Sequence, residues 1–302
     1  MKNPFMLCCA MLVLLVFGTY PALADDWADE DTPLSYHVEM LPWEQVNGII
    51  PKKAKFQIID IESGLNFWVQ RRAGSQHADV QPLSKKDTKI MKRIYHNKWS
   101  WDRRAIIVVV KDQMIAASMN GMPHGGGALL NGFRGHFCVH FSGSITHKLQ
   151  NEDPAHKLMI MKAAGKLDDY IHSLGPQELL QTFALGLNMK DIKVLNVIFT
   201  TQKHSKTVGE MMRDVQYFSV NTNQNFFPFD QETLLVFDAE FPVQYYSKKN
   251  GMVRKDMRFV FTRFSLTEPW SIQQKYIFKG FGMAVPRKSN SLKLRYKSDV
   301  RR

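Results

Sequence analysis

Alternating hydrophobic and polar positions predict β-strands in the first half of the chain. Residues 55–71 form a pattern of two strands joined by a turn at Glu62-Ser63-Gly64. A continuous β-branched run at 105–110 predicts a buried strand, which returns through a turn at 111–113 into a second strand at 114–119. Short turns join these strands, so we expect a mostly antiparallel sheet.

Helical spacing predicts two helices beside this sheet. Ser84 and Asp87 form the start of a capping box, and apolar residues follow at helical spacing. Asp153-Pro154 predicts the start of a second helix, because proline is favoured at the first helical position. Its apolar stripe runs as far as Leu174, and Gly175-Pro176 is expected to end it. We place a domain boundary there.

The pattern after this boundary predicts a smaller α+β domain. Its strongest signal is Asn-Gly between two alternating, aromatic-rich runs, which is typical of a β-hairpin. The expected elements are helices at 177–187 and 191–199, hairpin strands at 234–246 and 252–264 around Lys249-Asn250-Gly251, and a further strand near 270–278. The whole chain is therefore expected to be α+β.

The N-terminus has the pattern of a secretory signal peptide. Lys2 supplies a positive start, residues 6–17 an apolar run, and residues 21–24 a small-residue cleavage site. The apolar run is shorter than the roughly 20 residues that span a bilayer, so cleavage after Ala24 is expected instead of anchoring. We therefore expect an exported protein of the periplasm or cell wall. Residues 25–48 are expected to form a loose, acidic leader.

Composition and charge narrow the classes of protein. The chain is 44% hydrophobic and 23% charged, which excludes a disordered, collagen-like or polytopic membrane protein. Its formal net charge is +12, and a basic tail occupies residues 285–302. In an exported protein this tail is expected to bind anionic envelope polymers or lipid head groups and not nucleic acid; a solvated tail is the alternative.

The cysteines point to one position. Cys8 and Cys9 lie within the signal, so the mature chain keeps only Cys138 and has no internal disulfide. Cys138 stands in the middle of His136-Phe137-Cys138-Val139-His140. In a strand, successive side chains point to opposite faces, so His136, Cys138 and His140 are expected to share one face.

A thiol among imidazoles favours nucleophilic chemistry. An imidazole can take the thiol proton or stabilise the thiolate, and the glycine-rich loop at 121–127 can offer backbone N–H groups to an oxyanion. Zinc binding is the competing functional interpretation, although ligands at i, i+2 and i+4 of one strand fit a tetrahedral ion poorly. A polar strand face with hydrogen-bonded histidines is the third. We expect no metal and no cofactor.

These residues resemble the catalytic motif of the YkuD-type L,D-transpeptidases, exported bacterial enzymes that act on peptidoglycan. The family pattern is His-Gly, followed along the chain by Ser-His-Gly-Cys, a hydrophobic residue, and Arg or Asn. His124-Gly125 is similar to the first part and residues 136–140 to the second. Three residues depart from this pattern. Gly135 stands where the family has Ser, Phe137 where it has Gly, and His140 where it has Arg or Asn.

The resemblance implies a β-sandwich catalytic domain with flanking helices and a two-step acyl transfer. Cys138 would attack the amide before the terminal D-alanine of a stem tetrapeptide. His124 would act as general base, and His136 would orient it or shuttle a proton. An amine acceptor would give a 3-3 cross-link, whereas water would make the enzyme an L,D-carboxypeptidase.

Further residues are candidates for substrate or oxyanion contacts, or for supporting hydrogen bonds: Gly125, Phe137, His140, Ser144, His147, His77 and Arg104. For some of them a structural role is the simpler interpretation. His77 with Asp79 is typical of a turn-stabilising hydrogen bond, and Arg104 of a structural salt bridge. His156, in the first turn of the helix after Pro154, is expected in solvent.

The expected organisation is a signal peptide (1–24), the leader (25–48), the catalytic domain (49–174), the C-terminal domain (175–284) and the basic tail (285–302). Residues 178–191 resemble the start of the nuclear transport factor and ketosteroid isomerase fold, which implies a binding or spacing module. Peptidoglycan stem peptides are the expected partner. The alternatives to an L,D-transpeptidase are a non-catalytic wall-binding protein and, third, a zinc-dependent peptidase or amidase.

Overall fold

The computed structural model describes residues 37–145, 151–199, 205–222, 227 and 230–285. The predicted signal peptide, His147 and all but the first residue of the basic tail lie outside these ranges. No helix among the described residues is both long enough and apolar enough to cross a membrane.

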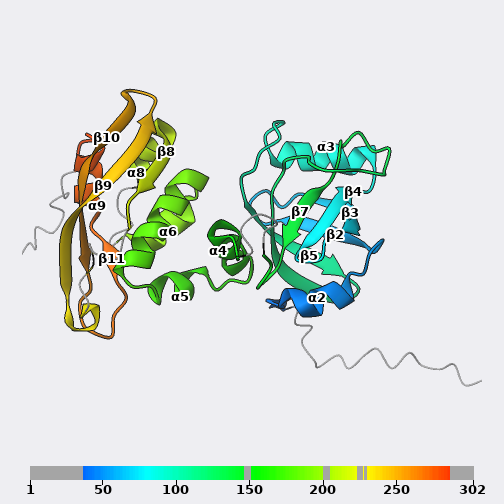
Figure 1. Cartoon of the computed structure of the whole chain (residues 1–302), viewed down its shortest axis with the longest axis horizontal. Coiled ribbons are helices and arrows are strands. Elements are labelled where there is room, and N and C mark those ends of the chain that lie inside the picture. The colour runs from blue at the N-terminus through cyan, green and yellow to red at the C-terminus, as the bar shows by residue number, and fades with distance from the viewer. Residues whose placement is uncertain (1–36, 146–150, 200–204, 223–226, 228–229, 286–302) are drawn as a thin grey trace, which may run out of the picture. The chain divides into compact units, whose positions relative to one another are not determined.

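A seven-stranded sheet occupies the first half of the described chain (Figure 1). In spatial order its strands are β1 (Val38–Glu39), β6 (Gln113–Met119), β5 (Arg104–Val110), β2 (Lys55–Asp60), β3 (Asn66–Ala73), β4 (Ala78–Pro82) and β7 (Phe137–His140). β1 runs parallel to β6, and the other pairs are antiparallel. Because β7 pairs with both β4 and β6, six of the strands form a closed ring.

The predicted strand pattern produces the core inside this ring. Phe56 and Ile58 of β2 and Phe67 and Val69 of β3 are all buried, as their alternation predicts. The helix predicted after Ser84 is α3 (Lys85–Ile94). Ser84 is confirmed as its N-cap, since the Ser84 hydroxyl accepts the backbone N–H of Asp87 at 3.2 Å.

The expectation of a loose leader up to residue 48 is wrong for its last part. β1 pairs with β6, and α2 (Trp43–Ile49) follows it. Trp43 and Val46 are buried in the core of the first sheet, and the Trp43 ring stacks on Phe141 with centroids 5.9 Å apart. The leader prediction rested on the acidic residues at 25–31, which lie outside the described residues, whereas burial of apolar side chains stabilises the later segment.

The single helix predicted from Pro154 to Leu174 is two helices. α4 (Pro154–Ala163) and α5 (Leu167–His172) are separated at Gly165, whose φ is +70°. A left-handed residue there ends α4, because glycine adopts this conformation without steric cost. The predicted start is confirmed: the Asp153 carboxylate accepts the backbone N–H of Ala155 at 2.8 Å.

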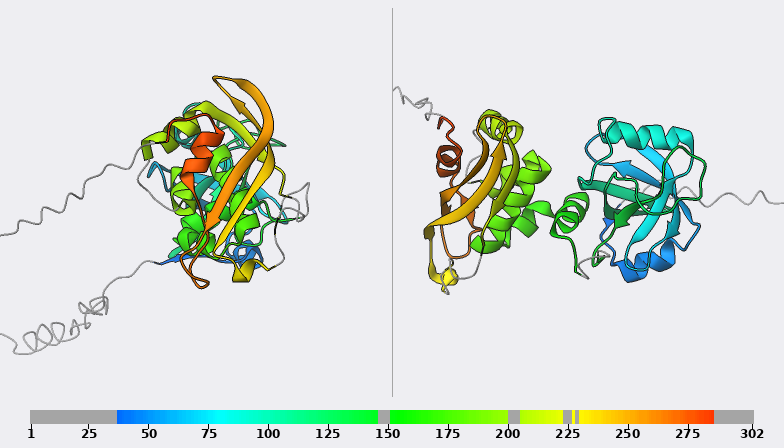
Figure 2. Two further views of the ribbon diagram at one scale, coloured as in Figure 1. Left: turned by 90° about the vertical axis from the view of Figure 1, so that its left-hand side faces the viewer. Right: turned by 45° about the horizontal axis from the view of Figure 1, so that its top comes forward.

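A second sheet follows in the order β11-β10-β9-β8, with all pairs antiparallel. The remaining elements are α6 (Pro176–Met189), α7 (Ile192–Ile198), α8 (Ser205–Asp214), β8 (Val215–Val220), a 3-10 turn (Gln231–Thr233), β9 (Val236–Ser247), β10 (Gly251–Thr262), β11 (Ser271–Ile272) and α9 (Gln274–Gly280). The predicted hairpin is β9–β10, whose long strands lie side by side in Figure 2.

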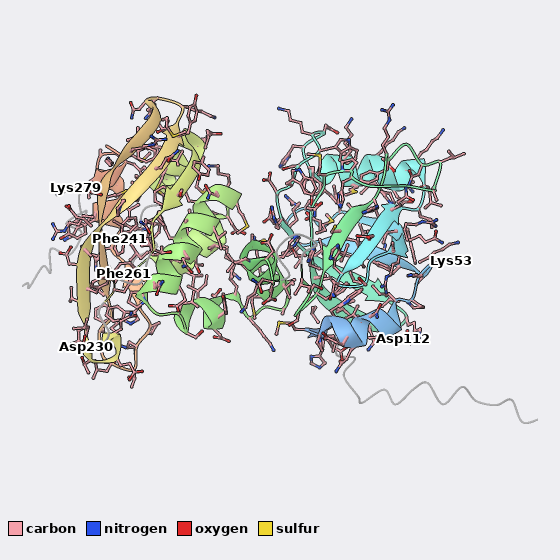
Figure 3. All side chains as sticks on the ribbon, viewed as in Figure 1. Lys53, Asp112, Asp230, Phe241, Phe261 and Lys279 are labelled. Carbon is pink, nitrogen blue, oxygen red and sulfur yellow. The ribbon has the colours of Figure 1, made fainter. Side chains whose placement is uncertain are left out.

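Two expectations about this half change. Pro176 opens α6 instead of only ending the helix before it. The strand expected near 270–278 is the short β11 followed by α9. The sequence patterns identified neither α8 nor β8. The sheet is held by an aromatic core: Phe241 and Phe261 are fully buried, with ring centroids 6.5 Å apart (Figure 3).

The chain is therefore α+β with mostly antiparallel sheets and several helices, as predicted. The division into domains at residues 174 and 175 stays a prediction.

Candidate functional site

The candidate site lies where β4 and β7 pair. Their register places Asp79 directly opposite Cys138, and directly opposed residues of antiparallel strands project to the same face. The Asp79 Oδ1 lies 3.8 Å from the Cys138 Sγ. Behind them, Phe137 packs in the core at 6.3 Å from the Phe67 ring. Phe137 thus contributes to packing through its side chain, on the face opposite to Cys138.

The glycine-rich loop brings His124 over this face. His124 and His136 exchange two backbone hydrogen bonds, of 2.9 and 2.8 Å, in an antiparallel bridge. Gly135 has φ +95°, and a Cβ there would lie much closer to the carbonyl oxygen of His124 than van der Waals contact allows. Gly125 has φ +59°, and its Cβ would meet the His136 ring. Both close approaches therefore require glycine.

His124 and Cys138 form a hydrogen-bonded pair. The His124 Nε2 lies 3.2 Å from the Cys138 Sγ, and its Nδ1 lies 2.9 Å from the carbonyl oxygen of Met122. A carbonyl oxygen only accepts, so Nδ1 carries the proton and Nε2 presents its lone pair to the thiol. The Trp101 ring packs beside this imidazole at 5.1 Å.

Electrostatics keep both members of the pair neutral. Burial, then the charge of Asp79 and its hydrogen bond, raise the pKa of Cys138 to about 12, against a hydrogen bond from the Asn120 side chain that lowers it. Burial also lowers the pKa of His124. At neutral pH the pair is a thiol and a neutral imidazole, so the thiol proton must leave as the sulfur reacts.

His136 and His77 both lie close to the Asp79 carboxylate. The Nε2 atoms of His136 and His77 lie 3.7 and 3.2 Å from Asp79 Oδ1. Their Nδ1 atoms face backbone carbonyl oxygens, those of Gly126 and Ile145, each at 3.0 Å. The predicted His77–Asp79 contact is therefore present, although it lies on a buried polar face and not in a turn.

A stack of three buried imidazoles extends from this face. The ring centroids of His77 and His140 lie 4.5 Å apart, and those of His140 and His156 lie 3.8 Å apart. The expectation that His156 is solvated is wrong: it is 3% exposed, and its Nδ1 lies 2.8 Å from the Ser118 hydroxyl. α4 packs on β5 and β6, which buries its first turn. Burial lowers the pKa of His140 and of His156.

Two other candidates have structural contacts. Arg104 binds Asp60 through its Nε at 2.6 Å and Glu62 through Nη2 at 3.1 Å, which is the salt-bridge alternative. The Ser144 hydroxyl accepts the backbone N–H of Phe141 at 2.9 Å, so it stabilises the turn after β7. His147 lies outside the described residues.

Sequence reasoning missed the residue that ties the segment just after the glycine-rich loop to β4. The Gln81 side-chain oxygen accepts the backbone N–H groups of Ala128 and Leu129, at 2.9 and 3.2 Å. The signal was present, because residues 77–81 alternate polar and apolar and so place His77, Asp79 and Gln81 on one strand face.

Replacing Gly135 by alanine is expected to disrupt the His124–Cys138 pair. Gly132→Ala is a matched control, because Gly132 has φ +79° with open space around it. This variant should lower the free energy of unfolding by about 1–2 kcal/mol, because alanine disfavours the left-handed backbone. Gly135→Ala should cost about 4 kcal/mol or more, since the loop must also move. Urea unfolding measures both. Equal costs for the two variants would contradict the close approach at Gly135.

The arrangement combines a thiol, an imidazole positioned to accept its proton, and a carboxylate flanked by two further imidazoles. No protein-family model, curated protein or solved structure matches the chain. What the site does is therefore argued from its own residues.

Proposed function

We propose that this chain is an exported peptidoglycan L,D-transpeptidase with Cys138 as its nucleophile. The observation that carries the proposal is the pair in which His124 Nε2 lies 3.2 Å from Cys138 Sγ, with Nδ1 held by the Met122 carbonyl. This is the geometry that a general base and a thiol nucleophile need. The resemblance of the surrounding motif to the L,D-transpeptidases supplies the substrate class.

The reaction proceeds in two balanced steps. The Cys138 proton moves to His124 Nε2 while Sγ bonds to the carbonyl carbon of the amide before the terminal D-alanine. The C–N bond then breaks as the His124 imidazolium returns the proton to the departing amine, which leaves a thioester and free D-alanine. In the second step an amine of another stem attacks the thioester, its proton goes to the sulfur, and an amide is formed. Attack by water gives the shortened stem peptide.

The carboxylate of Asp79 supports the transient charge in this cycle. His136 Nε2 and Cys138 Sγ lie 3.7 and 3.8 Å from its Oδ1. This carboxylate opposes a permanent thiolate, and its charge favours the imidazolium that forms on His124. The site therefore holds its nucleophile protonated until proton transfer and attack occur together.

Around this site we infer the finer organisation that the sequence predicts. Residues 49–174 form an L,D-transpeptidase-like sandwich with flanking helices, and residues 175–284 form a module similar to the nuclear transport factor fold. The signal peptide directs export to the periplasm or cell wall, where the basic tail binds anionic polymers or lipid head groups.

Cys138→Ser is expected to abolish acyl-enzyme formation. Mature protein mixed with disaccharide-tetrapeptide should gain the mass of the substrate minus D-alanine, and free D-alanine should appear, because the thioester forms only on Cys138. Intact-mass spectrometry measures the adduct, and the serine variant is the control. Absence of both adduct and D-alanine from wild type would contradict the proposal, and dimers or tripeptides among the products would identify the acceptor.

A non-catalytic wall-binding protein is the second candidate, and one observation favours it. Cys138 is 5% exposed with a pKa raised to about 12, which is typical of an inert structural thiol. If muropeptides bind equally to wild type and Cys138→Ser and no D-alanine is released, this function replaces the first.

A further inference from the structure

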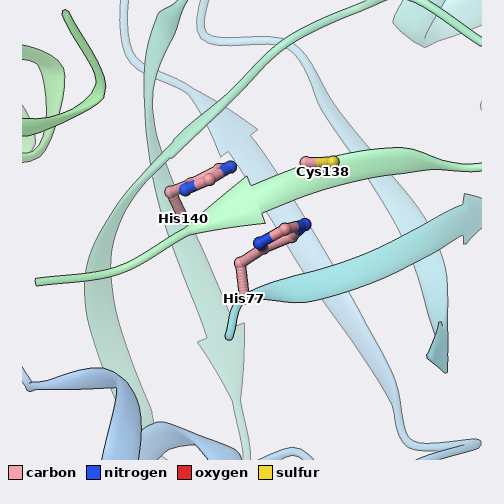
Figure 4. A group of neighbouring side chains, drawn as sticks. All are labelled: His77, Cys138 and His140. Carbon is pink, nitrogen blue, oxygen red and sulfur yellow. The ribbon is translucent and has the colours of Figure 1, made fainter. Parts of the chain in front are cut away.

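Three buried side chains on the polar face lie close enough together to bind one cation. One ligand atom each from His77, Cys138 and His140 lies within 4.8 Å of the other two. These residues are 1%, 5% and 3% exposed. Figure 4 shows the two imidazole rings roughly parallel, both extending toward the side where Cys138 projects. Cys138 and His140 belong to β7, whereas His77 immediately precedes β4.

The His77 ring is oriented as a metal ligand usually is. Its Nδ1 lies 3.0 Å from the carbonyl oxygen of Ile145, so this nitrogen carries the proton and Nε2 carries the lone pair. Histidine ligands commonly donate their second ring N–H to a backbone carbonyl in this way. Nε2 in turn lies 3.2 Å from Asp79 Oδ1. A lone pair and a carboxylate oxygen at this distance repel each other, and either a proton or a metal cation between them removes the repulsion.

His140 supplies an independent observation. Its Nδ1 is buried and has no hydrogen-bond partner among the described residues. A buried polar atom left without a partner costs about 1–3 kcal/mol, and native proteins rarely retain one without a functional reason. The ring is held between those of His77 and His156. The ring is therefore held in place, and binding of a cation requires that the three ligand atoms move closer together.

The ligand set selects the kind of cation. Two imidazole nitrogens and a thiolate are ligands for Zn²⁺, whereas Mg²⁺ and Ca²⁺ require oxygen ligands. A thiolate at Cys138 and the Asp79 carboxylate, with its Oδ1 3.8 Å from Sγ, together balance a divalent charge. Asp79 lies within reach of the fourth position or supports the ligands from outside.

We propose that His77, Cys138 and His140 form a buried binding site for Zn²⁺. The sequence analysis disfavoured zinc because His136, Cys138 and His140 are too crowded on one strand. The structure removes this objection, since the third ligand is His77, which lies just before the neighbouring strand β4, and not His136.

Zinc bound here would occupy the sulfur that His124 faces. The Cys138 thiolate would then be a metal ligand and not a nucleophile, so zinc and acyl transfer exclude each other. Only this consequence rests on the proposed function. The binding of zinc itself follows from the ligand geometry and is tested without any peptidoglycan substrate.

The test is metal titration of the full mature protein after removal of metal by a chelator. Zn²⁺ should bind with one equivalent in competition with a chromophoric chelator. Co²⁺ in its place should give the near-ultraviolet charge-transfer band of a cobalt–thiolate bond. His140→Asn and Cys138→Ser should each weaken zinc binding by more than about 100-fold, beyond what loss of an outer supporting residue costs. Asp79→Asn should weaken zinc binding by about 100-fold or less.

His172→Asn is the matched control, because His172 is exposed near the end of α5; it should leave the affinity unchanged. Zinc X-ray absorption on wild-type protein should show one sulfur and two imidazole ligands, which keeps the proposal testable if a variant does not fold. A spectrum without sulfur, or a titration in which His140→Asn binds like wild type, would overturn the site. Neither result bears on whether Cys138 forms an adduct with muropeptide, so the two proposals fail separately.

Discussion

Replacing His124 by glutamine is expected to slow alkylation of Cys138 by iodoacetamide, and acylation by muropeptide, by about 10²–10⁴-fold at neutral pH. The His124 Nε2 that accepts the thiol proton lies 3.2 Å from Sγ. Glutamine can accept a hydrogen bond at this position but cannot take the proton. Because the pKa of Cys138 is raised to about 12, almost no thiolate is present to react without a base.

The pH dependence gives this prediction its sharpest form. In wild type the rate should be level near pH 7 and fall in acid, because burial lowers the pKa of His124 below its ordinary value and the imidazole is neutral above it. In His124→Gln only thiolate reacts, so the rate should rise about tenfold per pH unit below the thiol pKa. Rates are measured by intact-mass spectrometry in chelator.

His172→Gln is the control for this variant, since His172 is exposed on α5, and it should keep the wild-type profile. A His124→Gln variant that also keeps the level wild-type profile would show that His124 is not the base. The iodoacetamide arm does not use a peptidoglycan substrate, so it tests the pair even if the substrate class is wrong.

The sequence predicts the residues of the site better than their environment. Alternation in residues 136–140 places His136, Cys138 and His140 on one face, and the structure has this alternation. It does not predict that Asp79 stands opposite Cys138, because this pairing depends on the register between β4 and β7, which are far apart in the chain. For the same reason His77 was associated with a turn, although it faces Asp79 and stacks on His140.

Burial was harder to predict than secondary structure. His156 was expected in solvent because the first turn of a helix is commonly exposed, but α4 packs that turn against β5 and β6. The break at Gly165 was missed because the apolar stripe continues through it at helical spacing. Local signals with a stereochemical cause were reliable: the Ser84 N-cap, the Asp153 cap with Pro154, and the Asn250-Gly251 hairpin turn.

Acid is expected to destabilise the protein well above the range where carboxylates titrate. Burial lowers the folded-state pKa of both His140 and His156, and the neighbouring His77 and Arg103 add to the effect. In the unfolded chain both histidines bind protons below about pH 6.5. A histidine whose pKa is lowered in the folded state favours folding while it is neutral. Its contribution to the free energy of unfolding is therefore complete above about pH 6.5 and is lost as the pH falls.

Two such histidines give a slope of about 2.7 kcal/mol of unfolding free energy per pH unit between pH 5 and 6. Asp153, whose pKa Arg103 lowers against the opposing effect of burial, contributes only below the ordinary carboxylate range and does not affect this window. Urea unfolding of metal-free protein at several pH values measures the slope, with His172→Gln as a control that should leave it unchanged.

His156→Gln should reduce this slope to about 1.4 kcal/mol per pH unit, because one of the two titrating groups is gone while glutamine can still bond the Ser118 hydroxyl. Its stability at neutral pH should fall through the lost ring stack on His140, and its relative stability should recover toward pH 5. The lost ring stack lowers the free energy of unfolding, whereas the lost titrating group raises it in acid relative to wild type. If the variant is less stable than wild type by the same amount at every pH, His156 contributes through packing alone. A crossing of the two curves would instead identify a buried imidazole that the folded state keeps neutral.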